Sequence, residues 1–133
     1  MAALYHLVQQ SLWEATKAAG APYKPPTYDA DGFTHLTQDP ALLLGVANHF
    51  YAAIAGPFLV LEIDPARLPD KVVFEPAAPV GTTPAVHADA VLFPHLYGPI
   101  PAAAVVRELA VERGGDGAFL SIQGLPQARL LAG

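Results

Sequence analysis

The stretch Phe58-Leu59-Val60-Leu61-Glu62-Ile63-Asp64 decides the fold class of this 133-residue chain. It is nearly all apolar, which is typical of a central β-strand that is covered on both faces. Glu62 is the exception, because it shares a face with Phe58 and Val60, where an unpaired carboxylate would cost free energy. We therefore expect this strand to lie inside a sheet and Glu62 to have a polar partner.

Strand-like segments lie on both sides of this stretch. They are residues 3–8, 33–37, 71–75, 105–112 and 118–122, with the glycine-rich sequence 114–117 as a hairpin turn between the last two. In the first segment, period-two alternation places Leu4, His6 and Val8 on one face and Ala3, Tyr5 and Leu7 on the other.

Two early helices complete the expected fold. Ser11 and Glu14 form a capping-box pattern that begins a helix ending at Gly20. Asp39-Pro40 begins a second helix that runs to about Ile54. Strands outnumber helices, so we predict one α+β domain over residues 1–122, one further helical turn at 101–103, and a loosely attached tail over 123–133.

The composition narrows the function classes. With 53% hydrophobic residues the chain is not intrinsically disordered. A formal net charge of -5 argues against nucleic-acid binding. The chain contains no Cys, which removes disulfides, thiolate metal sites and thiol nucleophiles. Neither a membrane-spanning apolar run nor a secretory signal is found, so we expect a soluble cytoplasmic protein.

The stretch Phe93-Pro94-His95-Leu96-Tyr97-Gly98-Pro99 is the strongest candidate for a functional segment. Proline fixes φ and glycine permits unusual backbone conformations, so the segment is expected to be short, stiff and non-helical. Such a segment can hold His95 and Tyr97 in fixed directions, as a binding or catalytic site requires. The alternative is a proline-cornered loop whose aromatic rings fill the core.

Familiar catalytic patterns are absent from the sequence. The histidines lack i, i+4 pairs and an H-E-x-x-H motif, so no metal is expected. The alternative is a three-histidine site, since His6, His35 and His95 lie on separate elements that could converge. Ser11 and Ser121 are the only serines, and neither lies in a G-x-S-x-G elbow. No glycine-rich phosphate-binding loop is found either.

What remains is a set of polar side chains on apolar strands. Its members are His6, His35, Thr37, Glu62, His95 and Tyr97. Burying each of them separately would cost free energy, so we expect them to share one polar cleft that binds a small molecule. Histidine titrates near neutral pH and can orient a ligand or move a proton. His49 and His87 are expected to be solvated.

Several motifs together resemble a known family, domain-of-unknown-function family 952. They are Leu4-Tyr5-His6-Leu7, Trp13-Glu14-Ala15, Asp31-Gly32-Phe33-Thr34-His35-Leu36-Thr37, Gly45-Val46-Ala47-Asn48-His49-Phe50, Leu61-Glu62-Ile63-Asp64 and Phe93–Pro99. The resemblance extends to about Glu112. It implies similarity to the ADP-ribosylation superfamily, an α+β architecture with split β-sheets in which active members bind NAD in the cleft between them.

The resemblance also implies roles for particular residues. His6 would contact a ribose, and His35 or Thr37 would support the nicotinamide side. In such enzymes a glutamate late in the chain polarises the ribose, but Glu62 lies on an earlier strand than that glutamate. At the corresponding late position this chain has His95 and Tyr97 instead.

The histidine-rich set is also similar to that of the RNA 2′-phosphotransferase branch. That activity needs several arginines to hold phosphate, and here only Arg107 lies on an apolar strand face.

Two hypotheses follow. The first is an enzyme, or former enzyme, with an ADP-ribosyltransferase-like cleft for NAD or a related nucleotide. Its catalytic residues would be His6, His35 and His95, and its ligand-binding residues Thr37, Glu62, Tyr97 and Arg107. The second is a non-catalytic module that binds a small metabolite or a protein, with structural histidines.

Overall fold

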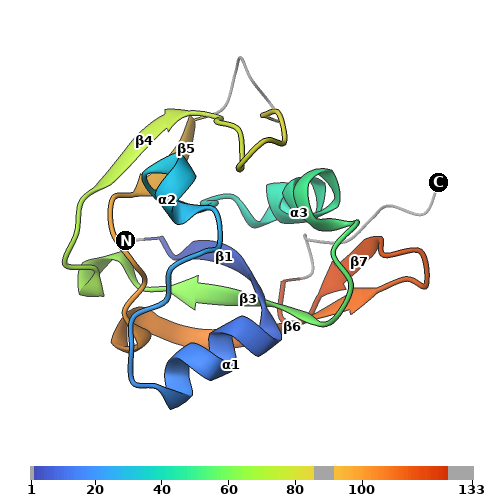
Figure 1. Ribbon diagram of the computed structural model, residues 1–133, viewed down its shortest axis with the longest axis horizontal. Coiled ribbons are helices and arrows are strands. Elements are labelled where there is room, and N and C mark those ends of the chain that lie inside the picture. Colours follow the sequence, from blue (N-terminus) through green and yellow to red (C-terminus); the bar gives the residue numbers. More distant parts are fainter. Residues whose placement is uncertain (1, 86–91, 126–133) are drawn as a thin grey trace.

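The computed structural model describes residues 2–85 and 92–125 and is built on two antiparallel sheets (Figure 1). The first has the order β1-β3-β6-β7, formed by Leu4–Gln9, Phe58–Ile63, Val105–Arg113 and Phe119–Ile122. The second has the order β2-β5-β4, formed by Thr34–His35, Leu92–Leu96 and Val72–Pro76. The helices are α1 (Gln10–Ala18), α2 (Tyr28–Asp31) and α3 (Leu43–Tyr51), with 3₁₀ turns at Pro40–Leu42, Pro65–Arg67 and Ala102–Ala104. The α+β prediction is confirmed.

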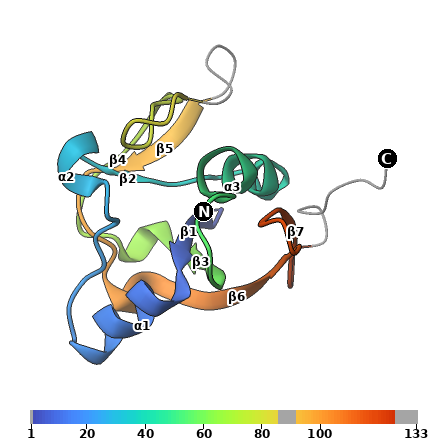
Figure 2. The same ribbon diagram turned by 45° about the vertical axis from the view of Figure 1, so that its right-hand side comes forward.

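The strand β3 lies inside the first sheet, between β1 and β6, as its apolar sequence predicted. Phe58 and Val60 pack in one buried cluster with α3, while Leu59 and Leu61 pack in another that contains Trp13 of α1. Figure 2 shows the resulting layers, with the sheet between α1 and α3. Burial on both faces explains why this strand lacks an alternating polar pattern.

The predicted faces of β1 are also confirmed. Tyr5 and Leu7 belong to the cluster beneath α3, and Leu4 and Val8 belong to the cluster around Trp13. His6 lies between Leu4 and Val8 and is 4% exposed. The sequence of β1 therefore places an imidazole on a buried face of the sheet.

The capping box predicted at Ser11 is wrong. The helix α1 begins at Gln10 directly after β1, and its N-cap residue Gln9 makes no side-chain capping hydrogen bond. The N–H of Gln10 instead donates to the carbonyl of Pro57, at 3.0 Å, across the strand pair. A tertiary backbone contact thus replaces the local cap that the pattern indicated.

The second helix begins as predicted and ends early. The carboxylate of Asp39 accepts from the N–H of Ala41 at 2.9 Å, which confirms its capping role. A 3₁₀ turn then leads into α3, which ends at Tyr51, before Ile54. The short helix α2 also lies partly within the predicted loop 21–30.

The two sheets meet near the N-terminal end of β1. Tyr5 and Thr37 exchange two backbone hydrogen bonds, of 2.8 and 2.9 Å, which link β1 to the residues that follow β2. The segment that contains His95 forms β5, the middle strand of the second sheet, so it is extended and non-helical as predicted. This junction brings residues 6, 35 and 95 toward one region.

The first residues of the predicted tail are attached to the domain. The N–H of Gln123 donates to the carbonyl of Ala110 at 2.9 Å, and Leu125 is buried in the core beneath α3. The rest of the tail and His87 lie outside the described residues. In the part of the chain that the structure describes, no helix is long and apolar enough to cross a membrane.

Gly117 allows the β6–β7 hairpin to approach the end of α3. Its φ is +92°, and a Cβ atom there would lie 2.3 Å from the carbonyl oxygen of Ala52. We expect Gly117→Ala to lower the free energy of unfolding by about 2 kcal/mol, measured by urea denaturation, because it combines backbone strain with a clash. Gly115→Ala is the matched control, since a Cβ at Gly115 meets no atom within 4 Å. Equal effects of the two substitutions would contradict this explanation.

Candidate functional site

A pocket lies where the two sheets meet beneath the segment 77–85, which follows β4. Its polar lining comes from Tyr5, His6, His35, Thr37, Tyr51 and His95. The cavity volume is about 40 Å³, room for a few water molecules or part of one small ring. Three histidines from three different strands therefore share one small cavity.

His6 is held in a single tautomer by the backbone. Its Nδ1 lies 2.7 Å from the carbonyl oxygen of His35, and because a carbonyl can only accept, Nδ1 carries the hydrogen. Burial lowers the pKa of His6 to about 4, so the ring is neutral at physiological pH. Its Nε2 then has a free lone pair, and this buried atom has no hydrogen-bond partner among the described residues.

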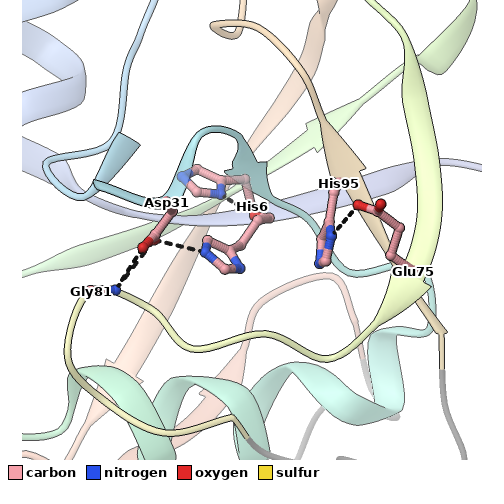
Figure 3. A network of polar contacts seen from close by, with 6 residues as sticks. His6, Asp31, Glu75, Gly81 and His95 are labelled. Atoms are coloured by element: carbon pink, nitrogen blue, oxygen red, sulfur yellow. Dashed lines mark hydrogen bonds and ion pairs between the residues drawn. The ribbon is translucent and has the colours of Figure 1, made fainter. Parts of the chain in front are cut away.

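His35 is oriented by a carboxylate four residues before it in the sequence. Its Nε2 donates to Oδ2 of Asp31 at 2.9 Å. Burial lowers the pKa of His35, although the hydrogen bond and the charge of Asp31 oppose this shift. Asp31 also accepts from the N–H of Gly81 at 3.0 Å, so one carboxylate fixes both the imidazole and the 77–85 segment (Figure 3).

His95 is oriented by a second carboxylate. Its Nδ1 donates to Oε1 of Glu75 at 2.8 Å (Figure 3). The hydroxyl of Tyr97 donates to the same oxygen at 2.6 Å. These two donors hold the pKa of Glu75 below its usual value, and Glu75 in turn raises the pKa of Tyr97. His95 is 2% exposed, and its Nε2 is buried without a partner in the described structure.

Phe33 packs against both carboxylate-bound histidines. Its ring is stacked on that of His95 with centroids 4.1 Å apart, and lies 4.7 Å from that of His35. The rings of His35 and His95 are 5.6 Å apart in an edge-on arrangement. These contacts restrict the rotamers of the two imidazoles and keep them in the pocket wall.

The structure gathers some predicted site residues and separates others. His6, His35, His95 and Thr37 all line the pocket, as the shared-cleft argument expected. Tyr97 is outside the lining and reaches the pocket through the Glu75–His95 pair.

Glu62 and Arg107 lie apart from the pocket. The guanidinium of Arg107 donates to Oε1 of Glu62 across β3 and β6, with its Nε at 3.1 Å. This ion pair answers the expectation that Glu62 needs a polar partner. It lies beside the pocket residue Tyr5, the cross-strand neighbour of Glu62, but neither charged residue lines the pocket.

Sequence reasoning did not identify the orienting carboxylates. In the sequence, Asp31 is only part of a motif shared with the family, and Glu75 is only the last residue of the predicted strand 71–75. The i, i+4 spacing of Asp31 and His35 was an available signal, but Glu75 approaches His95 only through the pairing of β4 with β5. Tyr51, whose pKa burial raises to about 12, was likewise missed on the pocket face of α3.

A second cavity adjoins the first on the other side of His6. Its volume is about 100 Å³, and it shares His6, Leu7, Tyr51 and Val80 with the first pocket. The ring of Tyr23 forms part of its wall, 5.8 Å from that of His6. His6 therefore lies between two cavities.

The arrangement is suited to hydrogen bonding and proton transfer. Within residues 2–85 and 92–125, no group of three or more His, Asp or Glu side chains is arranged to hold a metal ion. Two histidines bound to carboxylates can instead act as general acids or bases, because the carboxylate fixes the tautomer and orientation of each ring.

Comparisons with known proteins found a matching family model and solved structures with a similar fold. The family model described as protein of unknown function (DUF952) matches residues 7–108. A crystal structure of protein CC0527 from Caulobacter crescentus is 25% identical, covers 88% of this chain and 92% of that chain, and superposes with a TM-score of 0.66. A solution NMR structure of CC0527 is 24% identical, covers 94% of each chain and gives a TM-score of 0.64. The search of curated proteins found no match.

Proposed function

Since the chain belongs to the DUF952 family of unknown function, we propose a function from its own geometry: the pocket binds the nicotinamide–ribose end of NAD or of a related nucleotide, in an ADP-ribosyltransferase-like cleft. The observation that carries this proposal is the buried Nε2 of His6, a neutral hydrogen-bond acceptor without a partner in the described structure.

A ribose hydroxyl is a fitting partner for His6. The Nδ1–H of His6 is already used by the carbonyl of His35, so Nε2 can only accept. Leaving a buried acceptor unpaired costs about 1–3 kcal/mol, and a hydroxyl donor from a ligand would recover part of this. The same site would not bind an ionised carboxylate or a phosphodiester oxygen, since these offer no hydrogen.

The size and lining of the pocket fit a small ring better than a whole dinucleotide. The cavity holds about 40 Å³, and its walls include Phe50, Phe93 and Tyr51. Aromatic and apolar walls with a few convergent polar groups are typical of small-molecule sites. Part of the nicotinamide or ribose ring would enter this space, and the rest of the nucleotide would extend away from it.

The carboxylate-bound histidines supply the chemistry of a group transfer. In an ADP-ribosyl transfer, the bond between the ribose and the nicotinamide nitrogen breaks and neutral nicotinamide leaves. The anomeric carbon bonds to an acceptor oxygen or nitrogen, whose proton passes to a base. His35 or His95 would take this proton, and Asp31 or Glu75 would stabilise the imidazolium that forms.

The proposal places the protein in the cytoplasm, with a small-molecule ligand and without nucleic-acid, membrane or metal requirements. The acidic composition and the absence of Cys support this placement. The location is tested by fractionation of cells that express the chain.

Ligand-induced thermal stabilisation tests the function. We expect wild type to be stabilised by NAD, and His6→Ala, His35→Ala and His95→Ala to fold but lose this stabilisation. Arg67→Ala is the control, because Arg67 is exposed and outside the pocket lining, whereas His49, which was expected to be solvated, lies 2.7 Å from the carbonyl of Pro84 in the segment above the pocket. Equal melting temperatures with and without NAD for wild type would refute the proposal.

A second candidate function rests on a different observation. Each of the three histidines already has one polar partner of its own, which a purely structural role also requires. A non-catalytic module that binds a small metabolite or protein predicts that the same substitutions lower the melting temperature by several degrees, without any nucleotide preference. The variants therefore separate the two candidates in one experiment.

A further inference from the structure

We infer that this site selects an uncharged or cationic hydrogen-bond donor and excludes phosphate, so that a nucleotide would be recognised by its nucleoside end alone. This inference rests on the proposed function and deepens it. It follows from the charges around both cavities and from the direction in which the histidine N–H groups donate.

Positive charge is missing from the lining of both cavities. None of the described residues that line them is Lys or Arg. The six described cations are engaged elsewhere: Lys17 with Glu108, Lys24 over Tyr28, Arg67 with Asp64, Lys71 over Tyr97, Arg107 with Glu62, and Arg113 with backbone carbonyls. Tight phosphate binding relies on Arg, Lys or clustered N–H donors, so the pocket lacks the usual means of holding a diphosphate.

Negative charge lies directly behind the histidines. Asp31 accepts from His35, and Glu75 accepts from both His95 and Tyr97. These bonds turn the N–H and O–H hydrogens away from the cavity and toward the carboxylates. What His6 presents in addition is an Nε2 lone pair.

The pocket therefore offers histidine acceptors and the hydroxyls of Tyr5, Thr37 and Tyr51. Behind it lie the charge of Asp31, whose side chain is 7% exposed, and that of Glu75, which is 34% exposed and faces Lys71. An anion would be repelled most strongly beside the buried Asp31, whereas a cation or a neutral donor would be attracted. The oxidised nicotinamide ring is cationic, and the ribose and carboxamide supply O–H and N–H donors. A nicotinamide nucleoside thus satisfies the site better than its phosphates do.

The experiment compares ligands that differ in their phosphate groups. Isothermal titration at one ionic strength would use nicotinamide riboside, nicotinamide mononucleotide, NAD, ADP-ribose and inorganic phosphate. We expect the first three to bind within about threefold of one another, and ADP-ribose and phosphate at least about tenfold more weakly. Raising the salt concentration should leave the affinity for NAD nearly unchanged, because no phosphate contact is lost.

The outcomes distinguish this inference from the proposed function. ADP-ribose or phosphate binding as tightly as NAD would overturn the inference and leave nucleotide binding in place. Binding of the riboside without binding of NAD would overturn both, because the inference expects the two to bind almost equally. If none of these ligands binds, both are wrong.

A variant isolates the role of the carboxylate. Glu75→Gln removes the charge behind His95 and should weaken nicotinamide riboside about tenfold while changing the affinity for uncharged nicotinamide much less. Glu112→Gln is the matched control, because Glu112 pairs with Ser121 on the exposed β6–β7 hairpin. Equal weakening of the cationic and the neutral ligand by Glu75→Gln would show that Glu75 acts only through packing, and would overturn the inference.

Discussion

Replacing Arg113 with alanine should lower the free energy of unfolding by about 3 kcal/mol, the cost of leaving several half-buried carbonyls without a charged donor. For a chain of this size, such a loss lowers the melting temperature by roughly 10 °C. Urea denaturation and differential scanning calorimetry measure the two quantities. Arg113→Lys should recover only part of the loss, since an ammonium cannot reproduce the planar fork of donors.

The contacts of Arg113 explain this large effect. Its Nη1 donates to the carbonyls of Ile54 and Gly56, both at 2.7 Å, and its Nη2 donates to those of Gly117 and Ala52 at 2.8 and 3.2 Å. These groups join the C-terminal end of α3 to the β6–β7 hairpin. A cation there also interacts favourably with the negative end of the helix dipole.

The aromatic core adds to the role of Arg113. Its guanidinium carbon lies 4.2 Å from the ring centroid of Phe119 and 5.2 Å from that of Phe58. Arg67→Ala is the matched control, because Arg67 is exposed and makes one ion pair with Asp64 and one long hydrogen bond to Ala103. A loss at Arg113 no greater than that at Arg67 would contradict the proposed capping role.

Arg113 also shows why sequence patterns reach only part of the fold. The strands were predictable because alternation and continuous apolar runs reflect burial within a few neighbouring residues, as at Phe58–Ile63. Arg113 ends the strand β6, which was predicted correctly, yet most of its carbonyl partners lie about sixty positions earlier in the chain. No local sequence pattern indicates which distant carbonyls Arg113 contacts. The sequence instead indicated Arg107 as the candidate ligand-binding arginine. The α1 cap failed for a similar reason, since Pro57 supplies the contact that Ser11 was expected to make.

The candidate site, like the fold, was only partly predictable from the sequence. Polar residues on apolar strands indicated that His6, His35, His95 and Thr37 should meet, and they line one pocket. Burying these polar side chains separately costs free energy in any fold, so this prediction did not depend on the strand order. Which carboxylate orients which histidine ring depends on how the strands pair, so the role of Glu75 could not be predicted from the sequence. Glu62 instead forms an ion pair with Arg107 across the sheet.

The stability of the protein should fall steeply as the pH decreases from 6.5 to 4, mainly because of His6. The ordinary pKa of histidine is 6.5, and burial lowers that of His6 to about 4 in the folded state. Between these values the unfolded chain binds a proton that the folded chain does not, so acid favours unfolding. Full stability from this group is present above pH 6.5, and about 3 kcal/mol of it is lost by pH 4.

His6→Gln should remove most of this pH dependence, because glutamine does not titrate. The measurement is the free energy of unfolding from urea denaturation at intervals between pH 4 and pH 7, and the slope matters more than the absolute value. His35, whose pKa is also lowered, should leave a smaller residual slope of the same sign in the variant. An unchanged slope in His6→Gln would mean that His6 has the same pKa in the folded and the unfolded chain. That result would contradict the buried, neutral imidazole on which the ribose contact and the selection against phosphate rest.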